Sequence, residues 1–137
     1  MHVRDGMSKL VLTVGPGHTL RQAAELMARR NVGAAVVVDP DGEGPGILTE
    51  RDILQAVAQG QDPSEEQVCN HLTAESVSAE PDWSLEEAAV AMVRGGFRHL
   101  LVVEGGETVG IVSMRDIVRC WTDDGATSEV RANASAA

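Results

Sequence analysis

The sequence predicts an α+β protein made of two copies of one βαββα unit. Only 2% of the residues are aromatic, so aliphatic side chains must build the core, and runs such as Val36-Val37-Val38 favour strands over a helical bundle. The chain also repeats itself. A shift of 65 residues superposes two similar sets of residues, namely Pro16, Thr19, Leu20, Ala23, Ala24 and Met27 on Pro81, Ser84, Leu85, Ala88, Ala89 and Met92.

The first helix of each copy begins at a predicted capping box, Thr19-x-x-Gln22 in one copy and Ser84-x-x-Glu87 in the other. In this motif the hydroxyl and the later side chain satisfy backbone N–H groups at the start of the helix. The apolar residues that follow are spaced i, i+3, i+4 and i+7, which places them on one side of a helix. We expect both apolar stripes to pack on a sheet.

A predicted hairpin follows each of these helices. Its first strand covers 34–38 in one copy and 99–103 in the other, and after a turn rich in Gly, Pro and acidic residues its second strand runs into Thr49 or Ser113. The strand that opens each unit is expected around 12–14 and 77–79. The closing helices carry these apolar residues: Ile53, Leu54 and Val57, or Ile117, Val118 and Trp121.

The repeat predicts two units, one over 1–61 and one over 62–122 that begins with a linker helix. Asp62-Pro63-Ser64-Glu65 supplies this helix with an N-cap, a proline at its first position and an acidic first turn. We expect the two units to pack face to face about a pseudo-twofold axis, because one small sheet cannot bury both of its faces. The tail over 123–137 lacks periodicity and is expected to be largely disordered.

The composition argues against several classes of protein. A net charge of −10 disfavours nucleic acid as a partner, because protein surfaces that bind nucleic acid set Lys and Arg against its phosphates. Cys69 and Cys120 are expected to be free thiols in a reducing compartment. No apolar signal region and no run of about 20 apolar residues occurs, so we expect a cytoplasmic protein that does not span a membrane.

Motifs of the common enzyme classes are missing from the sequence. It contains no nucleophile elbow, phosphate-binding P-loop, dinucleotide fingerprint or zinc-protease motif, and its four histidines lack metal-ligand spacing. We therefore expect a protein that is not an enzyme, holds no metal and requires no cofactor.

The motif Gly-x-x-Ser/Thr-x-x-Asp stands between the hairpin and the closing helix in both copies. Its residues are Gly46, Thr49 and Asp52 in the first copy and Gly110, Ser113 and Asp116 in the second. With the βαββα order, these motifs make the chain resemble the cystathionine-beta-synthase (CBS) repeat family over roughly residues 3 to 121. The resemblance implies a Bateman-type module that binds an adenosine-containing ligand in the cleft between its repeats.

Two roles are open for the polar residues of this motif. Thr49 and Asp52, like Ser113 and Asp116, stand at the N-cap and third positions of a helix, where they can act purely as caps. The resemblance implies that the aspartates also hold ribose hydroxyls, and that Thr49 and Ser113 contact ribose or phosphate. A helix start suits this role because its N–H groups favour an anion.

Basic residues distinguish the two copies. Arg98-His99 opens a strand in the second copy where the first has Gly33-Ala34. The resemblance implies that Arg98 contacts phosphate and that His99 is a polar neighbour, with Arg51 and Arg115 close by. The alternative is a surface charge at Arg98 and a half-buried His99. We expect one good ligand site and one weak or empty site.

The opening strands complete the expected contacts. The resemblance places adenine against residues 12–14 and 77–79, which makes Thr13 and Ser78 candidate binding residues. Leu12 and Val77 are better explained as strand core.

The resulting hypothesis is a regulatory module that binds AMP, ADP or ATP and signals by conformational change, as in energy sensing. S-adenosylmethionine, NADH and a cyclic dinucleotide remain open, because the motif would hold the adenosine that these ligands share. The resemblance also implies a homodimer, and a regulated enzyme or transporter would be a separate protein. The alternative function is a structural dimerisation or protein-interaction module with a vestigial ligand site.

Overall fold

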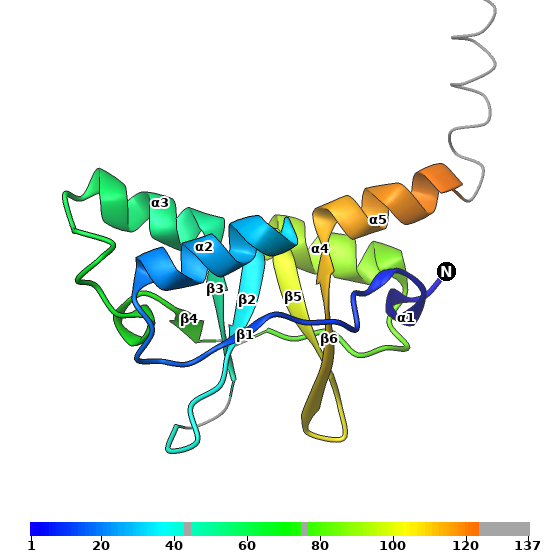
Figure 1. Cartoon of the computed structure of the whole chain (residues 1–137). Helices are drawn as coiled ribbons and strands as arrows, with labels where there is room; N and C mark the ends of the chain where they lie inside the picture. Colours follow the sequence, from blue (N-terminus) through cyan, green and yellow to red (C-terminus); the bar gives the residue numbers. More distant parts are fainter. Residues whose placement is uncertain (43–44, 75–76, 124–137) are drawn as a thin grey trace, which may run out of the picture. The chain divides into compact units, whose positions relative to one another are not determined.

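The computed structural model describes residues 1–42, 45–74 and 77–123, and it divides the chain into two compact units (Figure 1). One unit consists of residues 10–76. The other consists of residues 1–9 together with the chain from Val77 onward. Apart from Asp123, the tail that was expected to be disordered lies outside the described residues.

The unit of residues 10–76 contains a four-stranded sheet of order β1-β2-β3-β4. Its strands are β1 (Thr13–Val14), β2 (Ala34–Val37), β3 (Gly46–Thr49) and β4 (Thr73–Ala74). β1 is parallel to β2, and the other neighbours are antiparallel. The helices α2 (Leu20–Arg30) and α3 (Glu50–Ala58) lie toward the end of the sheet opposite the β2–β3 turn (Figure 1). The predicted βαββα order is confirmed for this repeat.

The other unit is built around the antiparallel hairpin of β5 (His99–Glu104) and β6 (Glu107–Ser113). It also contains α1 (Val3–Gly6), α4 (Leu85–Gly95) and α5 (Met114–Trp121). The strand predicted at 77–79 is a single parallel bridge from Ala79 to Val102. Pairing ends there because Pro81 follows closely and has no N–H to donate to a neighbouring strand.

The first nine residues have the same role in their unit that residues 66–74 have in the other. Both segments run along the start of a helix and then beside the last strand of a hairpin. The matching contacts are the bridges His2–Ser84 and Gln67–Thr19, followed by the pairs Ser8–Ile111 and Thr73–Ile47. Each of these two edge segments, residues 1–9 and residues 66–74, therefore forms one edge of the sheet of its unit. Each edge segment precedes, in the sequence, the repeat of the other unit.

The predicted linker helix is wrong, because Asp62-Pro63-Ser64-Glu65 forms a single turn before the short 3-10 helix η1 (Val68–Asn70). The carbonyl oxygens of Pro63 and Glu66 accept hydrogen bonds from the amides of Arg21 and Leu20, at 3.0 and 2.9 Å. A tertiary contact with the start of α2 thus uses carbonyl groups that a continuing helix would need for its own bonds.

The two long helices begin as the sequence predicts, with one difference. In α2 the Thr19 hydroxyl accepts from the Gln22 amide at 3.1 Å, and the Gln22 side chain accepts from the Thr19 amide at 2.9 Å. In α4 the Ser84 hydroxyl accepts from the Glu87 amide at 3.0 Å. The reciprocal bond is absent from the hydrogen bonds found among the described residues, so this box is half formed. Glu87 is exposed, and its carboxylate can stay hydrated.

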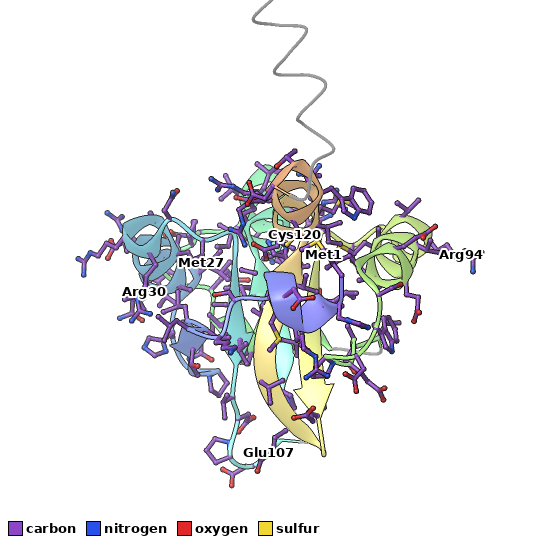
Figure 2. All side chains as sticks on the ribbon, turned by 90° about the vertical axis from the view of Figure 1, so that its right-hand side faces the viewer. Met1, Met27, Arg30, Arg94, Glu107 and Cys120 are labelled. Atoms are coloured by element: carbon purple, nitrogen blue, oxygen red, sulfur yellow. The ribbon has the colours of Figure 1, made fainter. Side chains whose placement is uncertain are left out.

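Each unit has its own apolar core, and most positions of the two cores correspond. The shared pattern includes the helix stripes and one valine from the edge segment: Leu20, Ala23, Met27 and Val68 in one core, and Leu85, Ala88, Met92 and Val3 in the other. All eight are buried, which confirms that the stripes pack on the sheets. Figure 2 shows Arg30 and Arg94, on the same helices, pointing outward.

Candidate functional site

The motif aspartates cap the N-termini of α3 and α5, the last helix of each repeat. Asp52 Oδ2 accepts from the Thr49 amide at 2.8 Å, and the Thr49 hydroxyl accepts from the Asp52 amide at 3.3 Å. The corresponding bonds between Ser113 and Asp116 measure 2.9 and 3.0 Å. The helix-capping role predicted for these residues is therefore confirmed.

Capping leaves the second carboxylate oxygen, Oδ1, of each aspartate for another partner. Asp52 Oδ1 accepts from the Thr73 hydroxyl at 3.4 Å, whereas Asp116 Oδ1 lies 3.2 Å from Nη2 of Arg119. Neither partner is among the site residues predicted from the sequence. Arg119 could have been found from its i,i+3 spacing to Asp116 on one helix. Thr73 is 21 residues from Asp52, and only the tertiary structure brings the two together.

The motif glycines stand where the edge segment passes closely over the hairpin. A Cβ atom on Gly110 would lie 2.7 Å from the Ser8 carbonyl oxygen and 3.0 Å from the Met7 sulfur. A Cβ atom on Gly46 would lie 2.7 Å from Cδ1 of Leu72 and 3.2 Å from the Thr73 carbonyl oxygen. The glycine is thus required by the close backbone approach that also brings Thr73 to Asp52.

Strand register brings Arg98 and His99 to the motif of their own repeat. His99 pairs with Ser113 across the β5–β6 hairpin, and the carbonyl oxygen of the exposed Arg98 accepts from the Met114 amide at 2.9 Å. In the other unit Ala34 pairs with Thr49, and Gly33 accepts from the Glu50 amide at 3.0 Å. The basic pair therefore adjoins a helix start in one unit, and no charge stands at these positions in the other.

The residues that begin α3 and α5 add a second electrostatic difference, which the sequence analysis missed. α3 begins with Glu50 and α5 with Met114, and each is followed by an exposed arginine, Arg51 or Arg115. The first turn of α3 thus holds two carboxylates, Glu50 and Asp52, and that of α5 holds one, Asp116; the additional carboxylate opposes the binding of an anion at the start of α3. The start of α5 therefore suits a phosphate better than the start of α3.

The candidate residues on the opening strands lie farther from the motifs along the strands. Thr13 is exposed on β1 and pairs with Val36, two residues beyond the Ala34 that faces Thr49. Ser78 is partly buried and precedes the bridge at Ala79. Leu12 is buried in the core, as expected, and Val77 packs partly buried against the other core.

Histidine, cysteine and acidic side chains are the other candidate site groups among the described residues. Among them no group of three or more His, Cys, Asp or Glu side chains is arranged to hold a metal ion. Cys69 is exposed and Cys120 is buried, and both are free thiols, as predicted.

A helix that crosses a membrane must be both long and apolar. None in the described ranges meets both requirements.

Known proteins resemble this chain in sequence. The family model of the CBS domain matches it twice, over residues 3–59 and 68–123. The CBS domain-containing protein YhcV of Bacillus subtilis is 41% identical over 116 residues, which are 84% of this chain and 81% of YhcV. The two family matches begin at Val3 and Val68, the matched valines that the edge segments contribute to the cores.

Solved structures resemble it in fold. The CBS domain protein PAE2072 from Pyrobaculum aerophilum, complexed with AMP, has a TM-score of 0.76 at 29% identity, covering 85% of this chain and 89% of that one. The CBS domain pair of protein MJ0100, in complex with 5′-methylthioadenosine and S-adenosyl-L-methionine, has a TM-score of 0.80 at 26% identity, covering 90% and 98%.

Proposed function

Because the chain belongs to the CBS domain family, we propose that it is a non-catalytic regulatory module that binds an adenosine-containing ligand through its motif aspartates. The observation that carries this proposal is that the two oxygens of each motif carboxylate, in Asp52 and Asp116, have different partners. In both units Oδ2 caps a helix, while Oδ1 accepts from the Thr73 hydroxyl in one unit and forms an ion pair with Arg119 in the other. A ribose hydroxyl is a donor that can replace either partner at Oδ1.

The unit that contains Asp116 is the better candidate for a phosphorylated ligand. Arg98 adjoins the start of α5, and Met114 replaces the acidic first residue that α3 has in Glu50. A helix start with one first-turn carboxylate, Asp116, in place of the two of α3, and with an arginine in the adjoining residue, favours an anion more. This difference supports one strong and one weak site. PAE2072 with AMP and MJ0100 with two adenosine derivatives support adenosine as the shared part of the ligand.

Calorimetric titration with AMP, ADP, ATP and S-adenosylmethionine tests the proposal. The informative variants are Asp52→Asn and Asp116→Asn, because an asparagine oxygen can still cap the helix while its NH₂ group cannot accept from a ribose hydroxyl. We expect Asp116→Asn to weaken nucleotide binding about tenfold or more, the usual range for a hydrogen bond to a charged group. Asp52→Asn should have the smaller effect.

Ser84→Ala is the matched control, because it removes a cap contact in the same unit at a residue outside the proposed site and leaves Asp116 Oδ1 in place. Its binding should fall much less than that of Asp116→Asn. The proposal is contradicted if none of the four ligands binds the folded wild-type protein.

Exposed apolar residues support a second role in self-association. Leu54 and Val57 on α3 are 68% and 51% exposed, and Val118 and Trp121 at the matching positions of α5 are 55% and 42% exposed. Apolar side chains that recur at equivalent helix positions are typical of surfaces that a partner covers. We propose that these helices mediate a homodimer.

Light scattering coupled to size exclusion tests the dimer. The wild type should have twice the mass of one chain, and Leu54→Glu with Val118→Glu should reduce it to the monomer mass. The exposed Arg29→Glu on α2 is the control for added negative charge. A monomeric wild type contradicts the proposal.

A further inference from the structure

Arg119 connects the motif carboxylate of the second repeat to the N-terminal segment. Its Nη2 atom lies 3.2 Å from Asp116 Oδ1 and donates to the Gly6 carbonyl oxygen at 3.4 Å. Asp116 is only 15% exposed, whereas Arg119 is 58% exposed and is free to take another rotamer in solvent. One guanidinium group thus holds both the oxygen proposed to bind ribose and the end of α1.

The N-terminal segment, residues 1–9, is docked on its unit by backbone hydrogen bonds. The Val3 amide donates to Trp83 at 2.8 Å, and Ser8 and Ile111 exchange bonds of 2.8 and 3.1 Å. Val3 is fully buried, and α1 packs against α5, the helix that carries Arg119 and Cys120 (Figure 2). Release of this segment would uncover part of the core and one edge of the β5–β6 hairpin.

The first repeat lacks this connection. The residue that matches Arg119 is the exposed Gln55, and Oδ1 of Asp52 meets the Thr73 hydroxyl at 3.4 Å. Thr73 itself belongs to an edge segment, but it offers Asp52 a neutral donor. In the part of the chain that the structure describes, the second oxygen of Asp116 thus has a charged partner, whereas the partner given by Thr73 to Asp52 is neutral, so competition with a ligand hydroxyl differs between the repeats.

We infer that Arg119 makes ligand binding at Asp116 and docking of residues 1–9 mutually opposed. This inference rests on the proposed function. A ribose diol that takes Asp116 Oδ1 displaces the guanidinium group, and the Gly6 carbonyl loses its donor when the side chain turns away. The N-terminal segment then opens more often, which provides the conformational signal. Arg119 lowers the affinity for the ligand in this scheme, because a ligand must compete with its ion pair.

Hydrogen exchange with mass spectrometry on the full chain tests the inference, because exchange of a protected amide reports how often its segment opens. Saturating AMP should speed exchange of residues 3–8 in the wild type by about two- to fivefold, the range expected from loss of one partly exposed ion pair. Arg119→Gln, which gives the second repeat the residue of the first, should show this faster exchange without AMP and respond little to AMP. It should also bind AMP about two- to fivefold more tightly.

Gln55→Arg is the matched control in the first repeat, and it should leave exchange of residues 3–8 unchanged. The inference alone is overturned if AMP binds but exchange of residues 3–8 is the same with and without it. Unchanged exchange in unliganded Arg119→Gln contradicts the link from Arg119 to the segment, whatever the ligand does. Absence of AMP binding to all three proteins contradicts the proposed function for AMP and, with it, the ligand-driven half of the inference.

Discussion

The unit of residues 10–76 and the unit that joins residues 1–9 to the second repeat have matching cores and different polar surroundings. Leu20 and Val68 in one core correspond to Leu85 and Val3 in the other. Near the motif carboxylates, however, Glu50, Gln55 and Gly33 correspond to Met114, Arg119 and Arg98. The apolar positions must agree because both cores pack the same elements, whereas exposed polar positions can diverge at little cost to folding.

The largest effects should come from the matched core leucines. Leu20→Ala and Leu85→Ala each remove a side chain that is 1% exposed or less. Each should lower the free energy of unfolding by about 2–5 kcal/mol, since transfer and cavity costs add. Urea denaturation measures both. Costs of Leu20→Ala and Leu85→Ala that differ by more than about 2 kcal/mol would exceed most of the spread known for such substitutions. Such a difference would show that the two cores are not energetically equivalent.

The motif glycines should reveal a difference between the two edge segments. Gly110→Ala places a methyl group 2.7 Å from a backbone oxygen of Ser8, whereas Gly46→Ala meets the flexible end of Leu72 at the same distance. Overpacking of this kind costs about 1–3 kcal/mol, and we expect Gly110→Ala to lie near the upper end and Gly46→Ala near the lower. The same denaturation experiment checks this order. Equal costs would mean that residues 1–9 yield as easily as Leu72.

The helix caps should have similar and smaller effects in the two units. Thr49→Ala and Ser113→Ala each remove a hydroxyl that accepts from the aspartate amide, at 3.3 and 3.0 Å. A loss of about 1 kcal/mol is expected for each, as for other N-cap residues. Thermal denaturation followed by circular dichroism is the measurement. A loss confined to one variant would contradict the shared capping role.

Alkaline pH should weaken the unit that contains Cys120. Burial raises the pKa of the Cys120 thiol above its ordinary value of 9.0, with Asp116 adding to the rise and Arg119 opposing it. The folded state therefore keeps the proton longer than the unfolded state does. The resulting stability is present below about pH 9 and is lost as the pH rises through the raised pKa.

Urea midpoints between pH 8 and 10.5 test this smallest effect. The wild type should lose more stability over this range than Cys120→Ala. Alanine is chosen because Ala56 occupies the equivalent position in the other unit. Cys69→Ala, at an exposed thiol, is the control. Parallel pH profiles for the wild type and Cys120→Ala would contradict the predicted role of the buried thiol.

Local patterns in the sequence were sufficient to predict the repeat, the order of its elements and the capping role of Asp52 and Asp116. These features depend on neighbours within a few residues, such as Thr49 three positions before Asp52, and on the period of apolar side chains. The prediction of a linker helix that begins at Asp62 failed because the start of α2 takes the hydrogen bonds of the Pro63 and Glu66 carbonyls. No local sequence pattern indicates that these carbonyls will bond to amides more than 40 residues away in the sequence.

The sequence by itself determined the two βαββα repeats, their cores and the aspartates at the helix starts, because secondary structure and burial follow from short-range periodicity. Only the tertiary structure decided which repeat each edge segment completes. It placed Ser8 beside Ile111 and Thr73 beside Ile47, and so gave Asp52 a hydroxyl partner from its edge segment and connected Asp116 through Arg119 to Gly6. The physical reason is that edge pairing uses backbone groups that every residue has, so the choice of partner depends on the packing of the whole unit.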